Sequence, residues 1–360
     1  GYHFRASKQH FVAPTSKVLL PDPNLPTPLL DTYTGATVAY SLRKLRTAYT
    51  GSAIRIRRAS DNTETDIGFD VNNNLDTSAI SIFCGSSNGF VEIWYDQSGN
   101  TNNAIQETQD SQPQIYNGSA VITENGKPAL DFDGSNDCLT NANTLALPSP
   151  VQSSAILVTK LNNLSGAQQT VLEAQNYCRI AYAGSYMQGL NFAGHSDTST
   201  NSVSPSQYIS EVTTQQLVTI NYSGGTSNDK DSYTAFRNGS SQPITQGNAA
   251  SSLGRRTGFT IGARGSSHSQ FTQGLYQEVI LFDSNQDSAG NRTGIESNIN
   301  NHYSIYDTGL LEDYPGAVAA YSVRQLTTAA TSSMNIRRDS NQDELVIGFT
   351  SNGDLDTGSI

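Results

Sequence analysis

The sequence predicts an all-β protein: a β-sandwich of the jelly-roll type with a small N-terminal α+β subdomain and one closing helix. Two observations predict this fold. Short runs in which apolar and polar residues alternate follow one another through most of the chain, separated by turn residues such as "NGS", "DGSND" and "RNGSS". Only one long segment, residues 288–306, has apolar residues at clear helical spacing.

A long internal repeat sets the expected domain organisation. "GATVAYSLRKL" begins at Gly35 and "GAVAAYSVRQL" begins at Gly316, and the similarity continues to the last residue. A spacing of about 280 residues indicates a repeated domain rather than a solenoid. We therefore expect a leader at 1–34, a subdomain at 35–114, a sandwich at 115–306, a linker at 307–316 and a truncated second copy of the subdomain at 317–360. The second copy should fold as residues 36–80 do.

Each element follows from its local pattern. Prolines predict an extended leader, and helical spacing of apolar residues favours a helix at 35–45. Strands are expected at 53–60, 64–70 and 89–95, and then in eight further segments: 128–134, 153–162, 169–174, 177–183, 216–223, 232–239, 258–264 and 274–283. Ile295, Ile299 and either His302 or Tyr303 fall on one face of the closing helix.

The composition excludes several classes of protein. A net charge of −11 and a pI near 4.8 argue against nucleic acid as a partner, since its binders need a basic face. No apolar run approaches the roughly 20 residues that span a bilayer, so membrane insertion is not expected. Cys84, Cys138 and Cys178 are too few for a disulfide scaffold, which leaves either one bridged pair or three unpaired thiols.

Residues 115–306 resemble concanavalin A-like, laminin-G-type jelly rolls. The similarity lies in "GKPALDFDGSNDCL", "SSAILVTKL", "FRNGSSQP" and "GFTIGARGSSHSQFTQGLYQEVILFD". The preceding segment, "AYSLRKLRTAYTGSAIRIRRASDNTETDIGF" with "VEIWYDQSGNTNNAIQ", resembles the opening of the catalytic domain of family-54 α-L-arabinofuranosidases. It is also similar to modules found in tandem in marine phage structural proteins, and the repeat matches that setting better.

The arabinofuranosidase resemblance implies a pair of catalytic carboxylates, a Glu nucleophile and an Asp acid. The matching positions in this sequence are Gln188 and Ser266. An amide is no anionic nucleophile and a serine hydroxyl is no general acid near neutral pH. We therefore expect no arabinofuranosidase activity.

Three further groups of residues are candidates for binding or structure. Aromatic and polar side chains near the presumed concave face could contact sugar rings: Tyr182, Tyr186, Gln188, Phe192 and His195. The alternate acidic residues Asp131, Asp133 and Asp137 could hold Ca²⁺, although the same spacing is typical of a hairpin turn. Asp96 in "YDQSGN" is either catalytic or, as we favour, the cap of its own turn.

These observations favour a non-enzymatic structural or receptor-contacting protein of a virion, a fibre, spike or decoration component that also binds glycans. Its expected partners are copies of itself, other virion proteins and cell-surface glycans, and no cofactor other than Ca²⁺ is considered. The alternative is a secreted bacterial carbohydrate-binding adhesin or a degenerate arabinofuranosidase-like glycosidase. Either function places the protein at a virion surface or outside the cell.

Overall fold

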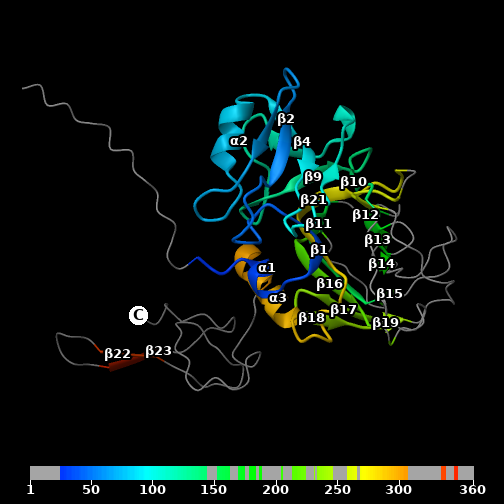
Figure 1. Ribbon diagram of the computed structural model, residues 1–360. Helices are drawn as coiled ribbons and strands as arrows, with labels where there is room; N and C mark the ends of the chain where they lie inside the picture. The colour runs from blue at the N-terminus through cyan, green and yellow to red at the C-terminus, as the bar shows by residue number, and fades with distance from the viewer. Residues whose placement is uncertain are drawn as a thin grey trace, which may run out of the picture.

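The computed structural model describes residues 25–143, most of 152–306 in segments, and the pairs of strands at 334–337 and 344–347. Within 152–306 the undescribed stretches are 163–168, 175–177, 184–185, 189–203, 206–212, 224–230, 232, 246–257 and 266–267. The described part of 25–306 has three layers: a helical layer, a first sheet and a second sheet (Figure 1). The all-β sandwich expected from the sequence is confirmed.

The first sheet is built around the long strand β21 (Gln273–Phe282). β11 (Ser153–Leu161) pairs with one edge of β21, while β1 (Ala36–Ser41) and β9 (Leu130–Asp133) share the other edge. Beyond β11 the sheet continues antiparallel through β16 (Gln216–Tyr222), β17 (Tyr233–Arg237) and β18 (Ser240–Gln242).

The second sheet begins with β3 (Glu64–Ile67), β2 (Ile54–Arg58) and β4 (Asn88–Trp94). It continues through β5 (Ala104–Ile105), β10 (Leu139–Asn141), β20 (Phe259–Ile261), β12 (Gln169–Ala174), β13 (Cys178–Ala183) and β14 (Tyr186–Gln188). β6 (Gln114–Asn117) pairs with both β4 and β9 and joins the two sheets. Short pieces complete the described elements: a 3₁₀ turn at Gln109–Ser111, the β7–β8 hairpin (Thr123–Glu124 and Lys127–Pro128), β15 (Ser204–Pro205) and β19 (Ile244–Thr245).

The main core lies between the sheets, and a second core lies on the outside of the first sheet. In β11, Ala155 and Leu157 point into the main core, whereas Ile156 and Val158 belong to the second core. Both faces of this strand are therefore buried, which explains why its sequence is apolar almost without interruption.

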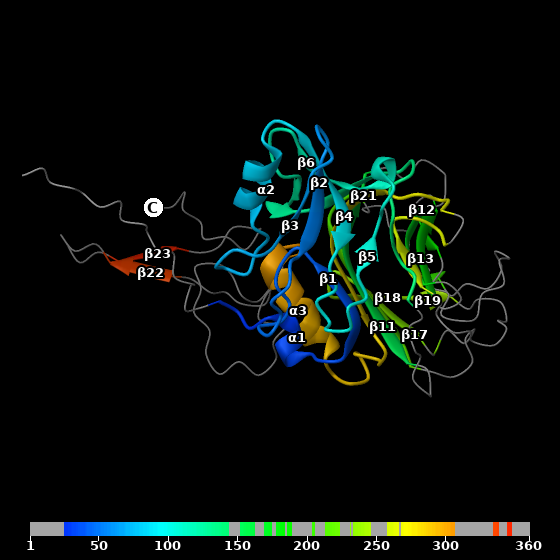
Figure 2. The same cartoon turned by 45° about the horizontal axis from the view of Figure 1, so that its top comes forward.

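Two helices cover the second core. α3 (Arg292–Tyr303) contributes Ile295, Ile299 and Tyr303, which confirms the closing helix and its apolar face. α1 (Leu29–Thr32) lies beside it, on the side of the sandwich away from β12 and β13 (Figures 1 and 2). The expectation of an extended leader through residue 34 is thus wrong for its last residues. Leu29 and Leu30 are buried, and an apolar pair of this kind gains more by packing than by extending into water.

The segment at 35–45 is a strand and not the expected helix. β1 pairs with β21 from Ala36 to Ser41, with Val38 and Tyr40 in the main core and Ala39 in the second core. Because both faces are buried, the alternation typical of a half-exposed strand is missing, and the remaining apolar spacing imitates a helix.

Residues 35–114 form part of the sandwich itself. β1 belongs to the first sheet, β2 to β5 belong to the second, and their apolar side chains share the main core with residues beyond 115. One further helix in this segment, α2 (Thr77–Cys84), was not expected from the sequence. It begins at Asp76, whose carboxylate accepts a hydrogen bond from the Ala79 N–H at 3.0 Å.

The hairpin of the first repeat recurs in the second copy. β2 and β3 pair Ile54 with Ile67 and Arg57 with Glu64, and β22 (Met334–Arg337) and β23 (Glu344–Ile347) pair Met334 with Ile347 and Arg337 with Glu344. The register agrees with the offset of 280 residues, although β22 is one residue shorter than β2, so the repeat is confirmed for this hairpin. The rest of 317–360 lies outside the described residues. No helix in the described ranges is long and apolar enough to cross a membrane.

Candidate functional site

A row of directly opposed residues crosses the outer face of the second sheet. Ile105 on β5 pairs with Thr140 on β10, Thr140 pairs with Thr260 on β20, and Thr260 pairs with Glu173 on β12. The neighbouring residues Leu139, Leu172 and Ile261 lie in the main core. Since successive strand residues alternate between faces, the row lies on the face away from the core.

A pocket of about 440 Å³ opens beside this row. Two chain segments line it, residues 101–108 and 140–143, together with His268. The lining consists mainly of hydroxyl and amide side chains, with one carboxylate at Glu107 and exposed apolar side chains at Ile105 and Ala142. Such a surface offers hydrogen-bond donors and acceptors with little net charge, which suits a neutral, polyhydroxylated ligand.

Glu173 is a carboxylate at this face that sequence reasoning missed. Its residue is 6% exposed, and it lies against the loop that continues to His268. Gly265, whose φ is +42°, packs closely against the Glu173 carboxylate. A Cβ atom at this position would lie only 3.3 Å from a Glu173 carboxylate oxygen. Glu173 is the only charged residue in the strand sequence "QTVLEA", and this isolated charge was the one sequence feature that could have marked it as a candidate.

The predicted sugar-contacting residues fall partly within the structure. Tyr182 lies in β13 and pairs with Met187, while Tyr186 and Gln188 lie in β14 and pair with Ala183 and Ala181. One hairpin of the second sheet thus holds Tyr182, Tyr186 and Gln188. Phe192, His195 and the acid position Ser266 lie outside the described residues.

Two of the three acidic residues proposed for Ca²⁺, Asp133 and Asp137, accept hydrogen bonds within their own turn. Asp133 accepts hydrogen bonds from the Ser135 and Asn136 N–H groups, and Asp137 accepts one from the Asp133 N–H at 2.9 Å. Burial raises the pKa of Asp137 to about 7, and burial followed by the charge of Asp133 raises that of Asp131. Within the described ranges, no three His, Cys, Asp or Glu residues form a group that could hold a metal ion. The geometry is that of a hairpin turn.

Asp96 caps its own turn and anchors β1. One carboxylate oxygen accepts from the Ala39 and Ser98 N–H groups, both at 2.9 Å, and the other accepts from the Ser98 hydroxyl and the Asn102 N–H. The Gln97 side chain extends the contact by bonding the main chain at Ser41, Arg43 and Leu45. "YDQSGN" therefore holds β1 and the residues after it in place, and both carboxylate oxygens of Asp96 are used in doing so.

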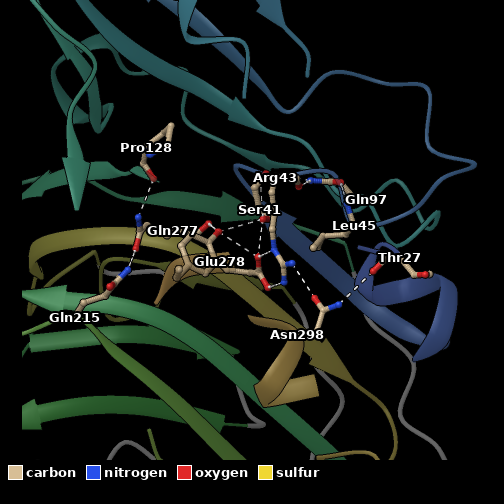
Figure 3. Close-up of polar contacts among 11 residues, drawn as sticks. Thr27, Ser41, Arg43, Leu45, Gln97, Pro128, Gln215, Gln277, Glu278 and Asn298 are labelled. Atoms are coloured by element: carbon tan, nitrogen blue, oxygen red, sulfur yellow. Dashed lines mark hydrogen bonds and ion pairs between the residues drawn. The ribbon is translucent and has the colours of Figure 1, made fainter. Parts of the chain in front are cut away.

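A buried ion pair connects β1, β21 and α3 (Figure 3). Arg43 donates to the two Glu278 oxygens at 2.9 and 3.1 Å and to the Asn298 side chain at 2.8 Å. Ser41 also donates to Glu278 at 2.7 Å. On the neighbouring residue of β21, the Gln277 amide donates to the main chain of Glu124, Lys127 and Pro128. These contacts hold β1, β21, α3 and the β7–β8 hairpin together.

Two of the three cysteines are free thiols. Cys84 and Cys138 are buried and unbridged, and burial raises the pKa of the Cys138 thiol to about 11. Cys178 lies in β13, and its side chain is outside the described part.

Comparison with known proteins finds one family profile that matches part of the chain and solved structures with a similar fold over most of it. The family profile described as α-L-arabinofuranosidase B, catalytic, matches residues 31–131. A GH54 α-L-arabinofuranosidase soaked with a cyclic sulfate inhibitor is similar in structure, with a TM-score of 0.54 and 17% identity over 86% of this chain and 69% of that one. An arabinofuranosidase complexed with arabinofuranosyl-α-1,2-xylobiose gives 0.54 and 18% over 82% of this chain and 67% of that one. No curated protein matches the sequence.

Proposed function

We propose that this protein binds carbohydrate without hydrolysing it, as a structural or receptor-contacting component of a virion. The observation behind the proposal is a polar pocket on the outer face of an arabinofuranosidase-like sandwich. The proposal is also supported by the sequence resemblance, which assigns the two catalytic positions to Gln188 and Ser266. Binding and hydrolysis need different groups, and the proposal is that this face supplies those for binding.

Hydrolysis with retention needs two carboxyl groups about 5 Å apart, one as nucleophile and one as acid. Gln188 supplies no negative charge and Ser266 no acidic proton. Glu173 brings one carboxylate to the same face, beside the Gly265 loop. Glu107 in the pocket lining is a second carboxylate, and neither residue stands at a position that the resemblance assigns to the catalytic pair.

The pocket has the size and chemistry of a sugar site. About 440 Å³ holds one or two saccharide units, within the usual range for ligand pockets. Hydroxyl and amide groups from Thr101, Thr108, Thr140 and Asn143 line it, with Glu107 at one side. Sugar hydroxyls both donate and accept hydrogen bonds, so a mixed lining of this kind matches them.

The virion setting is supported by the tandem repeat. A second hairpin with the same register as the first supports a repeat of the opening segment, and the sequence resemblance to tandem modules of phage structural proteins links that repeat to a virion. Labelling particles from the source with an antibody to this chain, and viewing them by electron microscopy, tests this part. Label on isolated cell walls instead would favour a secreted adhesin.

Glycan binding is tested with three single variants and an array of immobilised neutral oligosaccharides that includes arabinose-containing ones. Glu107→Gln and His268→Ala change the pocket lining, whereas Glu64→Gln removes a charge from β3, away from the pocket. We expect both pocket variants to lose at least roughly ten-fold in affinity, about 1.4 kcal/mol, and Glu64→Gln to bind like the parent. Equal binding by all four proteins would contradict the site.

A second function is favoured by one observation, the buried Glu173 beside the Gly265 loop. It would be a glycosidase in which Glu173 serves as one catalytic carboxyl. Release of 4-nitrophenol from 4-nitrophenyl α-L-arabinofuranoside, abolished by Glu173→Gln, would establish it and overturn the non-enzymatic proposal.

A further inference from the structure

A cavity on the helical side of the molecule is lined by basic side chains. Its volume is about 270 Å³, and it lies between residues 25–28, the 72–74 loop, β8 and α3. Arg43, Lys44, Lys127 and His302 all line it, and no Asp or Glu is among its described lining residues. It shares no residue with the pocket on the second sheet.

Two of these positive charges have no negative partner among the residues that the structure describes. Arg43 is neutralised by Glu278, with which it forms the buried ion pair. Lys44 and Lys127 are half-buried, and neither forms an ion pair with any described residue. In a chain with a net charge of −11, two unpaired lysines on one small cavity are a marked local concentration of positive charge.

Two carboxylates close to the cavity residues in sequence, Asp70 and Glu124, contact partners other than the two lysines. The Asp70 carboxylate accepts hydrogen bonds from the Asn72 and Asn74 N–H groups on its own side of the loop. Glu124, three residues before Lys127, pairs with Lys160 at 2.8 Å. The charge of the two cavity lysines is therefore available to a ligand.

The positive charges of the cavity also act on His302. Burial, followed by the positive charges of Arg43 and Lys127, lowers the pKa of His302 to about 2. The imidazole is neutral at physiological pH and offers one donor and one acceptor at the cavity wall. An anion placed in the cavity would offset the charges that act on this ring.

We propose that this cavity binds an oxyanion between Lys44 and Lys127, namely the sulfate or phosphate group of a small molecule or of a substituted saccharide. Tetrahedral oxyanions accept several charge-assisted hydrogen bonds, and ammonium groups supply them from two sides. The cavity is smaller than most sites for drug-sized ligands, which suits a single charged group or one monosaccharide unit.

The test is calorimetric titration of the full chain with four probes: inorganic sulfate, inorganic phosphate, galactose 6-sulfate and galactose. The double variant Lys44→Gln/Lys127→Gln removes the cavity charge. Arg55→Gln loses one positive charge on β2, outside the cavity, and controls for the general electrostatic effect without releasing Glu124 from Lys160. A circular dichroism spectrum and an unfolding curve for each variant show whether the fold is retained.

We expect saturable binding of the charged probes, none of galactose, and a loss of roughly ten-fold or more in the double variant but not in Arg55→Gln. Tighter binding of galactose 6-sulfate than of the inorganic ions would identify a sulfated saccharide as the ligand, and the reverse order a free oxyanion. Absence of saturable binding, or equal affinities in the parent and the double variant, would overturn the proposal.

Discussion

Replacing Glu278 by Gln tests how the buried ion pair contributes to stability. Glu278 is fully buried and Arg43 is 6% exposed, so the guanidinium loses its counter-charge without gaining water. The Gln amide keeps nearly the same shape and leaves the hydrogen bond from Arg43 to Asn298 in place. Removing one member of a buried pair leaves an uncompensated charge, which costs about 3–5 kcal/mol of unfolding free energy.

The measurement is urea and thermal unfolding followed by the fluorescence of Trp94, the single tryptophan of the chain and fully buried. For a domain of this size the expected loss corresponds to a fall in Tm of roughly 6–20 °C. Asp66→Asn is the matched control, because it breaks the ion pair with Arg55 whose side chains are 36% and 40% exposed. An exposed pair contributes at most about 1 kcal/mol.

The double variant Arg43→Met/Glu278→Gln completes the cycle. It removes both charges, so it should cost less than the sum of the two single changes. If Glu278→Gln is no more destabilising than Asp66→Asn, or if the cycle is additive, the buried pair does not hold β1, β21 and α3 together as described.

Three further predictions use the same unfolding assay or a related one. Asp96→Ala should lower the unfolding free energy by about 2–4 kcal/mol, because three main-chain N–H groups lose their acceptor. An unchanged urea midpoint would contradict the capping role of Asp96. Burial holds the pKa of Asp137 at about 7 in the folded protein, above its value in the unfolded chain, so the stability from this group is present below about pH 4 and is lost as the pH rises toward 7. Asp137→Asn should remove that loss, and parallel pH curves for the two proteins would refute the assignment. Cysteines at Asn335 and Val346, which are directly paired, should form a disulfide more readily than cysteines at Asn335 and Leu345, and the opposite preference would contradict the shared register.

The sequence predicted the strands well where apolar and polar residues alternate. In the second sheet, β2 and β3 alternate between the core and the outside, and the register between Ile54 and Ile67 recurs in the second copy. The prediction failed for β1 because both of its faces are buried. One face lies in the main core and the other in the second core, which α3 covers. A single sequence does not show that a helix packs on the second face. It also missed α2, whose eight residues are too few for a clear helical period.

The candidate site was predictable in outline only. The resemblance singled out Gln188, which lies in β14, a strand of the same sheet as the pocket. It did not reveal Glu173, because the distance along the chain from this residue to Gly265 hides their proximity in the folded protein. The basic cavity joins Lys44, Lys127 and His302, three residues far apart in the sequence, and no local pattern could have brought them together.

The most direct test of the central claim is one NMR experiment in which the protein is incubated with an arabinofuranosyl oligosaccharide. Saturation transfer from protein to ligand reports binding, and new anomeric signals of free arabinose report hydrolysis in the same tube. We predict transfer that is reduced in Glu107→Gln and His268→Ala, with no arabinose released over a day. Arabinose release that is lost in Glu173→Gln, or transfer that is unchanged in both pocket variants, would contradict the account.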